Sequence, residues 1–394
     1  MSNTIVASAT ARGTATEAAD ALSAGLKRSL QETDPKLVMV FASTDQPLAE
    51  VVATLAPRLP GSCVVGASSA GEFTQAGDTK GSVVAIAVAG DYIVRSGIGT
   101  NLRASYSNAV NEALRSIPEA VDGYPYRTAT LLLDPFAGNG EATTLEVAAR
   151  LGPHVRLAGG AAGDDLRMQE TWVACGSRAE RDAVVITVIF SKSPLGVGVC
   201  HAHEPISEPL TVTKAEGNVV YEVNGEPAWM VWKQHTEQAA KRLQLDPDHL
   251  DEVAAGQYLL RFEAALPSGS THKIRAPLSM SEKGALNFAC GMAEGTVFRI
   301  CESEPADQIR AAHKAAQLAR TQLDGPAAGA IVFDCICRNI ILQERFGEAV
   351  RGMAAELGNV PLGGFETYGE IALDVGDMSG FHNTTTVVLA FPKK

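Results

Sequence analysis

The sequence predicts a two-domain α/β protein in which mixed β-sheets are flanked by helices. Three stretches of the chain carry the same order of patterns: an apolar run, an amphipathic segment, a second apolar run and a glycine-rich loop. After each loop comes another apolar run, beginning near Ser82, Asp182 and Thr384, and such short runs rich in Val and Ile are typical of strands buried on both faces. The recurrence of strand, helix, strand, loop and strand predicts internally repeated structural units.

Each glycine-rich loop ends in a glycine followed by an acid. The loops read V-G-A-S-S-A-G-E at 65–72, L-A-G-G-A-A-G-D at 157–164 and G-G-F-E-T-Y-G-E at 363–370. The third unit has a longer stretch between its first apolar run and its loop, which predicts a longer helix there. Because the loops follow equivalent strands, we expect them to meet around one ligand site.

The first unit follows from local signals. T-A-T-E at 14–17 matches a capping box and predicts a helix with one apolar face, formed by Ala18, Leu22, Leu26 and Leu30. Strands are expected at 37–41 and 63–66. The helix between them has apolar residues at i, i+3, i+4 and i+7, namely Leu48, Val51, Val52 and Leu55.

The second unit begins with a predicted strand at 130–134 and ends near Phe190. Its helix is expected to contain Leu145, Ala148 and Leu151. Beyond Pro194 the pattern changes to alternation and turns, as in antiparallel sheet. We therefore place the domain boundary at Lys192, which gives domains at 1–192 and 193–394.

The second domain opens with a predicted hairpin. Strands at 210–213 and 219–223 bracket the turn at 216–218, and Asn224-Gly225 is a strong signal for a second tight turn. Pro227 suits the first turn of a helix through Trp232. Further strands are expected at 257–265, 274–278 and 296–301, followed by a helix at 306–323 with a small-residue face of Ala312, Ala315, Ala316 and Ala319.

Composition excludes several classes of protein. The chain has 394 residues, 46% of them hydrophobic and 20% charged, which is typical of globular domains. Its net charge of −12 and the absence of basic clusters argue against binding to nucleic acid or to an anionic membrane. No apolar run is long enough to span a bilayer, and no secretory signal is visible at the N-terminus. Seven cysteines without a regular framework fit a reducing cytoplasm.

Five motifs together resemble the FIST family of intracellular signal-transduction sensors. They are V-V-G-A-S-S-A-G-E at 64–72, G-G-A-A-G-D at 159–164, G-V-G-V-C-H-A-H at 196–203, V-T-K-A-E-G-N-V-V-Y-E-V-N-G-E-P-A at 212–228, and G-G-F-E-T-Y-G-E-I at 363–371 followed by F-H-N-T-T at 381–385. The resemblance covers nearly the whole chain, as an N-terminal FIST region followed by a C-terminal one.

The resemblance implies a sensory role in which a small ligand is bound and the signal passes to a separate protein. One branch of the family resembles sensors that bind haem b, detect nitric oxide and act on a histidine kinase. The alternative is a haem-free sensor of an amino-acid-like molecule. An enzyme built on a cluster of Glu, Asp and His residues is a further alternative, although the sequence lacks G-x-S-x-G, a P-loop and H-E-x-x-H.

The loop acids are the first candidates for ligand binding. Glu72, Asp164 and Glu370 each follow a glycine, where exposed N–H groups can approach a ligand closely. Aromatic Phe365 and Tyr368 share the loop of Glu370 and favour that loop as the main contact. The competing interpretation is that each carboxylate binds the backbone of its own loop.

Two further motifs, F-H-N-T from Phe381 and C-I-C-R from Cys335, add three polar candidates. His382 and Asn383 precede the last strand and are expected near Glu370, where they recognise a polar ligand or lock the turn, as short amides commonly do. Arg338 follows a strand, and its guanidinium is suited to form an ion pair with an acid of a glycine loop, a ligand carboxylate or a haem propionate. Cys335 and Cys337 are expected on one strand face, as buried apolar thiols or a soft-metal pair.

His201 and His203 are the candidate metal ligands. They end an apolar strand, and alternation places both on one face. One of these imidazoles would serve as the axial ligand of a haem in an apolar pocket, with Trp229 and Trp232 as its walls. Covalent haem attachment is excluded because no C-x-x-C-H occurs. The competing interpretation is that both histidines stand at a strand end without binding metal.

Overall fold

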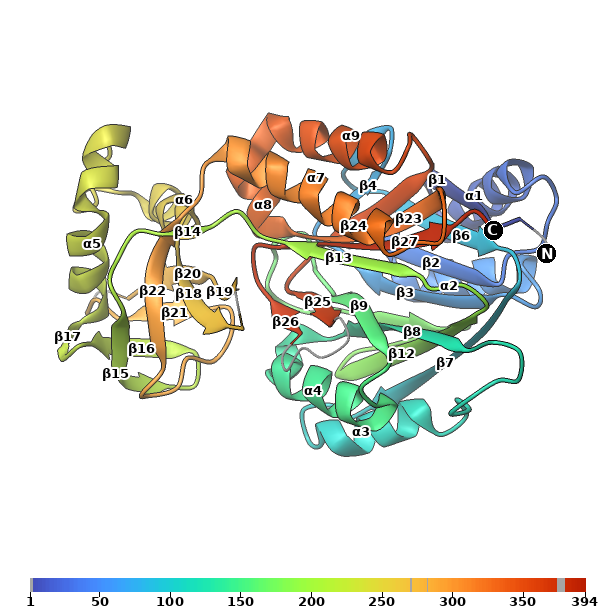
Figure 1. Cartoon of the computed structure of the whole chain (residues 1–394), viewed down its shortest axis with the longest axis horizontal. Helices are drawn as coiled ribbons and strands as arrows, with labels where there is room; N and C mark the ends of the chain where they lie inside the picture. The colour runs from blue at the N-terminus through green and yellow to red at the C-terminus, as the bar shows by residue number, and fades with distance from the viewer. Residues whose placement is uncertain (1–2, 270, 282, 374–379) are drawn as a thin grey trace.

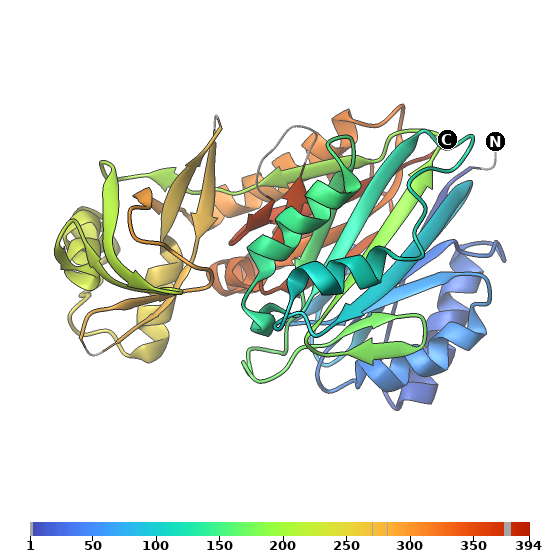
Figure 2. The same ribbon diagram turned by 90° about the horizontal axis from the view of Figure 1, so that it is seen from below.

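The computed structural model describes residues 3–394 apart from 270, 282 and 374–379. It consists of a large body with three β-sheets and a smaller lobe (Figure 1). The lobe is made by a continuous stretch of chain, 204–302, which leaves the body after strand β13 (Gly196–Cys200) and returns at helix α7 (Pro305–Thr321). Figure 2 shows the lobe beside one end of the body.

The three sheets of the body have matching strand orders. The first sheet is β1 (Ile5–Ala11), β6 (Val83–Ala89), β2 (Leu37–Ala42), β3 (Cys63–Ser68), β10 (Val173–Cys175) and β11 (Arg178–Glu180). The second is β7 (Tyr92–Thr100), β12 (Ala183–Ser191), β8 (Tyr126–Leu133), β9 (Arg156–Ala161), β25 (Glu370–Leu373) and β26 (Phe381–His382). The third is β13, β27 (Thr386–Pro392), β23 (Ala327–Cys335), β24 (Leu362–Thr367), β4 (Glu72–Thr74) and β5 (Gly77–Thr79).

Each sheet contains one parallel pair, β2–β3, β8–β9 or β23–β24, and its other pairs are antiparallel. The predicted mixed sheets are therefore confirmed. That the chain is built from internally repeated units stays a prediction. The division into domains at 1–192 and 193–394 also stays a prediction.

The hairpins that follow the glycine loops are exchanged among the sheets. The β4–β5 hairpin follows the first loop but pairs with β24 of the third sheet. The β10–β11 hairpin follows the second loop and pairs with β3, whereas β25–β26 follows the third loop and pairs with β9. Every glycine loop thus crosses from one sheet to another, which brings the three loops together at one end of the body.

Helices cover the outer faces of the sheets. The first sheet packs under α1 (Ala15–Ser29), α2 (Leu48–Leu55) and the short helix Ala56–Arg58. The second packs under α3 (Tyr106–Leu114) and α4 (Gly140–Leu151), with the 3-10 turn Pro135–Ala137 before α4. The third packs under α7 and α9 (Phe346–Glu356), which is preceded by α8 (Ile336–Leu342) and the turn Gln343–Arg345.

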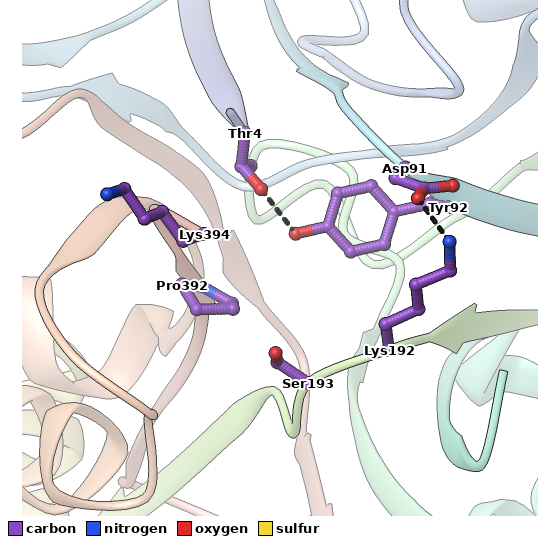
Figure 3. A pocket seen from close by; sticks show the side chains of 7 residues that line it. All are labelled: Thr4, Asp91, Tyr92, Lys192, Ser193, Pro392 and Lys394. Carbon is purple, nitrogen blue, oxygen red and sulfur yellow. Dashed lines mark hydrogen bonds and ion pairs between the residues drawn. The ribbon is translucent and has the colours of Figure 1, made fainter. Parts of the chain in front are cut away.

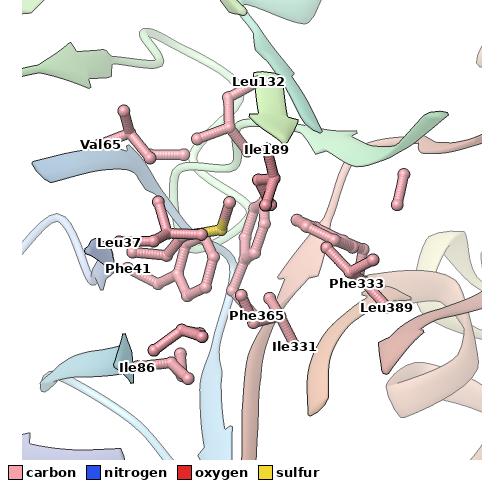
Figure 4. Packing of buried hydrophobic residues seen from close by; sticks show 14 of the residues in the cluster. Leu37, Phe41, Val65, Ile86, Leu132, Ile189, Ile331, Phe333, Phe365 and Leu389 are labelled. Carbon is pink, nitrogen blue, oxygen red and sulfur yellow. The ribbon is translucent and has the colours of Figure 1, made fainter. Parts of the chain in front are cut away.

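The inner faces of all three sheets meet in the central core. Phe41 stacks on Phe365 with ring centroids 4.3 Å apart, and Phe333 meets both rings edge-on (Figure 4). Burial of aromatic rings contributes strongly to such a core. Phe365, a predicted ligand contact, is therefore occupied by packing inside the body.

The predicted capping box begins α1. The Thr14 hydroxyl accepts the Glu17 N–H, and the Glu17 carboxylate accepts the Thr14 N–H at 2.9 Å. The predicted apolar faces of α1, α2 and α7 are confirmed, since their residues are buried.

The predicted second-unit helix is present as α4, which contains Leu145, Ala148 and Leu151. Ala148 and Leu151 are partly buried and pack against the core of the second sheet, whereas Leu145 is 40% exposed. The fully buried residues are Thr143, Thr144 and Val147, and the Thr144 hydroxyl donates to the Gly140 carbonyl at 2.8 Å.

The lobe is a sheet covered by two helices. Its strands are β19 (Thr271–Arg275), β18 (Phe262–Ser268), β22 (Val297–Glu302), β15 (Leu210–Glu216), β16 (Val219–Val223), β21 (Leu286–Phe288) and β20 (Pro277–Met280), with β14 (Glu204–Pro205) on β22 and β17 (Glu226–Pro227) on β16. Both predicted hairpin turns are present. Helix α5 (Ala228–Leu243) places Trp232 in the core, where its ring stacks on Phe298.

A predicted strand at 257–265 is wrong in its first half, because α6 (Glu252–Arg261) occupies that part of the chain. The Asp251 side chain accepts the Ala254 N–H at 2.8 Å and begins the helix. No helix within the described parts of the chain is long and apolar enough to cross a membrane.

Candidate functional site

The three glycine loops meet, as expected, and are joined in pairs by backbone hydrogen bonds. The first and third loops are linked by Ala70 N–H to Glu366 O at 3.0 Å and Glu366 N–H to Gly71 O at 2.8 Å. The other two links are Gly163 N–H to Ser68 O at 2.9 Å and Ala161 N–H to Gly369 O at 2.7 Å. The predicted convergence of the loops is therefore observed in their backbones.

Two of the glycines lie at this close approach. A Cβ on Gly163 would lie 2.6 Å from the backbone nitrogen of Ala70, so only a residue without a side chain fits there. A Cβ on Gly71 would lie 2.6 Å from a carboxylate oxygen of Glu366 and would displace that side chain.

The Glu72 carboxylate binds the hydroxyls of its own unit. It accepts hydrogen bonds from Ser69 and, at 2.8 Å, from Ser82. Burial raises the pKa of Glu72 to about 7, although these two hydroxyls oppose the shift.

The Asp164 carboxylate organises the loop that follows it. It accepts the N–H groups of Met168, Gln169 and Glu170 at 2.9, 2.6 and 3.1 Å. The hydroxyl of half-buried Tyr368 donates to it at 2.5 Å and so joins the third loop to the second.

The Glu370 carboxylate also has partners inside the protein. It accepts from the Thr367 hydroxyl and from the Thr385 N–H, the latter at 3.1 Å. Burial, followed by the nearby Cys335 thiol, raises the pKa of Glu370 well above its usual range. For all three acids the geometry thus favours the interpretation in which the carboxylate supports the loops, and their ligand-binding role stays a prediction.

The lobe meets the body at a second polar region, which we call the junction. Glu141 on α4 accepts hydrogen bonds from Lys273 at 2.6 Å and from Arg275 at 2.9 Å, both on β19. Arg275 is fully buried and also donates to the Phe381 carbonyl at 3.1 Å. These contacts hold the lobe against the hairpin that carries Glu370.

Glu263 on β18 is the deepest acid of the junction. Its Oε1 accepts from the Thr384 hydroxyl of the body at 2.7 Å, and its Oε2 lies 3.4 Å from Nε2 of His203. Burial raises the pKa of Glu263 well above its usual range and lowers the pKa of His203 to about 3. The Nε2 of His203 lies 3.1 Å from the Ser303 hydroxyl.

Arg338 has partners on all three of its nitrogens. Its Nε donates to Asp334 at 2.5 Å, and its two terminal nitrogens donate to the side chain and the carbonyl of Gln308. Arg338, on α8, thus pairs with Asp334 of the preceding strand β23, whereas the prediction paired it with an acid of a glycine loop. The i,i+4 spacing from Asp334 was the available signal.

Four buried polar atoms of the junction have no hydrogen-bond partner within the described chain. They are Nδ1 of His203, Oε2 of Glu263, Nε of Arg275 and Oδ2 of Asp334. Buried polar groups nearly always have partners, because an unpaired one costs about 1–3 kcal/mol. Three of the four residues, Arg275, Glu263 and Asp334, contact one segment, Phe381–Thr386, and His203 lies beside Glu263.

The remaining predicted residues also lie at the junction. His382 pairs with Glu370 between β25 and β26, and burial lowers the pKa of its imidazole to about 4. Asn383 accepts the N–H of Ala276 from the lobe at 3.4 Å and donates to the His382 carbonyl, so it locks this contact. His201 places its Nε2 3.0 Å from the His272 carbonyl.

The prediction that Cys335 and Cys337 share a strand face is wrong. Strand β23 ends at Cys335, and Cys337 lies in the first turn of α8. Both thiols pack in a small apolar cluster that also contains Leu260 and Ala276 of the lobe.

The residues around the two candidate histidines do not fit a haem. Each Nε2 atom has a partner, His203 stands among polar groups, and Trp229 and Trp232 pack inside the core of the lobe. Among the residues that the structure describes, no three His, Cys, Asp or Glu side chains are arranged to hold a metal ion.

Two pockets lie away from the loops. One, of about 30 Å³, is lined by Thr4, Tyr92 and Lys192 near the chain ends (Figure 3), and its Tyr92 hydroxyl bonds to Thr4 at 2.8 Å. The other, of about 390 Å³, lies along α5 and contains Lys233 and Leu245. Neither contains a predicted site residue.

Sequence reasoning missed Glu263, Arg275 and Asp334 near the junction, and Glu366 where the first and third loops meet. Glu263 and Arg275 lie in segments whose sequence pattern is that of ordinary β-strands. Their only signal was a charged residue inside an apolar run. Glu366 is buried and accepts from Asn339 at 2.5 Å, and burial raises its pKa well above the usual range.

Comparison with known proteins gives matches to two family models. The FIST N domain model matches residues 36–226, and the FIST C domain model matches residues 237–373. The chain is also 26% identical over 161 residues to an uncharacterized protein of Methanocaldococcus jannaschii. That match covers 40% of this chain and 31% of the relative, so the chain spans about a third of the relative's length.

Proposed function

Because the chain belongs to the FIST family, whose two domains cover most of it and indicate a small-ligand sensor, we propose that it binds its ligand at the junction between body and lobe. The ligand-bound protein then signals in the cytoplasm through a separate protein such as a histidine kinase.

The observation that carries this proposal is the set of four unpartnered atoms at the junction. Carboxylate oxygens of Glu263 and Asp334 accept N–H groups, whereas Nε of Arg275 donates to an anionic oxygen. A ligand with both an ammonium and a carboxylate group meets all of these requirements. This favours the amino-acid-like alternative, with Glu263 and Arg275 in the roles first considered for Glu370 and Arg338.

The junction also supplies a route for the signal. Its groups come from both parts of the molecule: Glu263 and Arg275 from the lobe, and Thr384 and Glu141 from the body. A ligand that binds between the lobe and the body shifts the equilibrium between two positions of the lobe only if its affinity for the protein differs between those positions. Binding at a shared boundary provides such a difference.

Thermal unfolding in the presence of each proteinogenic amino acid tests the proposal. We expect at least one amino acid to raise the unfolding temperature of the wild type and of Glu208→Gln, whose side chain is 90% exposed in the lobe. The same amino acid is expected to have no effect on Glu263→Gln, because the amide cannot offer two acceptor oxygens. Equal stabilisation of both variants, measured also by calorimetric titration, places the site elsewhere.

The haem alternative has a separate test. Protein produced with ample haem supply carries a Soret band if haem b is bound, and the band is lost in the variant that removes the axial ligand, His201→Ala or His203→Ala. Colourless protein that rejects added haemin removes both the haem and the nitric-oxide hypotheses.

A further inference from the structure

Two cysteines of the first sheet meet one serine of the second sheet inside the body. The Cys63 thiol on β3 donates to Oγ of Ser96 on β7 at 2.9 Å, and the same oxygen lies 3.2 Å from Sγ of Cys175 on β10. Both thiols are free, and both cysteines are half-buried, as is Ser96. We call Cys63 and Cys175 the thiol pair. Because all three side chains keep some exposed surface, a small ion from solvent can reach them.

The pairing of the strands places the two thiols on one face of the first sheet. Cys175 is opposite Val65 across β10 and β3, and Cys63 lies two residues from Val65 on the same strand. Both cysteines pack against the central core. Such diagonal neighbours have Cα atoms about 7–8 Å apart, whereas a disulfide usually needs about 4.4–6.8 Å. An ion held between the two sulfur atoms therefore fits this spacing better than a direct S–S bond does.

Thr187 on β12 gives a second indication of a site beside the thiol pair. It is opposite Ser96 across β12 and β7, so the two side chains lie on the same face of the second sheet, toward the central core. Thr187 is 1% exposed, and its hydroxyl has no hydrogen-bond partner within the described chain. Buried hydroxyls nearly always have a partner. An unused hydroxyl thus stands next to the serine that contacts both sulfur atoms.

The electrostatic surroundings decide the state of the thiol pair. Burial raises the pKa of Cys63 to about 11 and raises the pKa of Cys175 above its usual range, although the Ser96 hydroxyl opposes both shifts. Protonated thiols react slowly with peroxides, so the pair lacks the character of a redox sensor. The charges of Arg95 and Arg178 lower the pKa of Cys63 and of Cys175, respectively. These guanidinium groups favour thiolates once a cation displaces the protons.

The number and type of ligands select the ion. Soft sulfur ligands favour Cu(I), Zn(II) and iron–sulfur clusters, whereas Mg(II) and Ca(II) take oxygen ligands. Structural zinc and iron–sulfur clusters require four ligands. Among the residues that the structure describes, no third His, Cys, Asp or Glu joins the thiol pair. Cu(I) forms stable complexes with two sulfur ligands, so it is the ion that this pair fits.

We propose that Cys63 and Cys175 form a binding site for one Cu(I) ion per chain. Cu(I) binds to the two sulfur atoms while both S–H protons leave to solvent, which converts two neutral thiols into a bis-thiolate complex with one net negative charge. Copper stays as Cu(I), so no electron is transferred. The Ser96 and Thr187 hydroxyls are available to donate to the thiolates, and the two guanidinium groups offset the charge. The site shares no residue with the junction and does not rest on the proposed ligand there.

Competition with bicinchoninate, a coloured chelator of Cu(I), tests the proposal on the intact chain. The protein is reduced, freed of thiol reagent and titrated with Cu(I) without oxygen. We expect the wild type to withdraw one equivalent of Cu(I) from the chelator. Loss of an outer-shell partner alone weakens metal binding about 10–100-fold, so Cys63→Ser and Cys175→Ser should each bind at least about a hundredfold more weakly. Ser96→Ala retains both thiols and should bind about tenfold more weakly.

Two controls should bind Cu(I) as the wild type does. Cys200→Ser removes another half-buried thiol, and Cys335→Ser/Cys337→Ser removes the two thiols that pack together near the lobe. Unfolding temperatures without copper show whether each variant is folded. X-ray absorption of the copper-loaded wild type, which needs no substitution, should show two sulfur ligands.

Four outcomes overturn the proposal. They are failure of the wild type to compete with the chelator, unchanged binding by folded Cys63→Ser or Cys175→Ser, loss of binding in the Cys335→Ser/Cys337→Ser variant, and nitrogen ligands in place of sulfur in the absorption spectrum.

Discussion

Arg275 on β19 of the lobe donates from Nη2 to Oε2 of Glu141 on α4 of the body, at a distance of 2.9 Å. The guanidinium is 1% exposed, whereas the carboxylate is 37% exposed. Lys273 shares the same carboxylate, so one acid at the surface of the body holds two cations of the lobe. This contact stands at the boundary across which the proposed ligand acts.

The variant Glu141→Gln should loosen the lobe. A buried guanidinium that loses its carboxylate is destabilised, and partial exposure of Glu141 reduces the cost to about 1–3 kcal/mol. We expect faster amide hydrogen exchange in β19 and β26, with the rest of the body unchanged. Glu146→Gln, which removes an ion pair with Arg150 within α4, is the control and should leave exchange in β19 unaltered.

The close approach of the glycine loops gives a second prediction. Gly163→Ala places a Cβ against the backbone of Ala70, which cannot move without disturbing two sheets, so the variant should lose about 1–3 kcal/mol of unfolding free energy. Gly256→Ala, in α6, meets nothing within 4 Å and should be neutral or slightly stabilising. Urea unfolding compares the two. Equal stability of Gly163→Ala and the wild type would show that the loops tolerate separation.

Local signals account for the elements that the sequence predicted well. The capping box of α1, the apolar face of α2 and the alanine face of α7 each depend on residues within a few positions of one another. The exchanged hairpins depend on contacts between distant strands, such as Phe73 opposite Gly364, which leave no local pattern. Helix α6 was missed because Y-L-L at 258–260 suits either a helix or a strand.

The candidate site was predicted only in part, because local patterns do not report contacts between distant segments of the chain. Residues named by motif, such as Glu370, His382 and Asn383, do lie at the junction. Glu263 and Arg275 were missed because their importance comes from the docking of the lobe on the body. Phe365 was misplaced because strand alternation alone does not distinguish the central core from a ligand pocket.

Tyr368→Phe tests the support of loop 164–170. The variant removes the hydroxyl that binds both Asp164 and the Leu166 N–H, and buried hydrogen bonds to a carboxylate contribute about 1–3 kcal/mol. We expect lower unfolding free energy and faster proteolysis at 164–170. Tyr126→Phe, at a side chain that is 43% exposed, is the control. Proteolysis at the same rate as in the wild type would mean that contacts other than the Tyr368 hydroxyl fix the loop.

The last prediction concerns the pH dependence of stability through Glu72. Burial raises the pKa of Glu72 in the folded protein to about 7, from 4.5 for an exposed glutamate. The folded state therefore holds a proton that the unfolded state has released, and its stability falls as pH rises from 4.5 to about 7. This loss is on the order of 3 kcal/mol, is complete above that range and is absent below it.

Glu72→Gln retains a buried polar group but cannot titrate, so its unfolding free energy should fall less across this range than that of the wild type. Burial also raises the pKa values of Glu263, Glu366 and Glu370, and their contributions have the same sign. Only the difference between variants therefore reports on Glu72. Urea unfolding at several pH values measures it, with Glu50→Gln, at an exposed position on α2, as the control. Parallel pH profiles for the wild type and Glu72→Gln would show that the carboxyl is already ionised in the fold, because a group with the same pKa in both states contributes no slope.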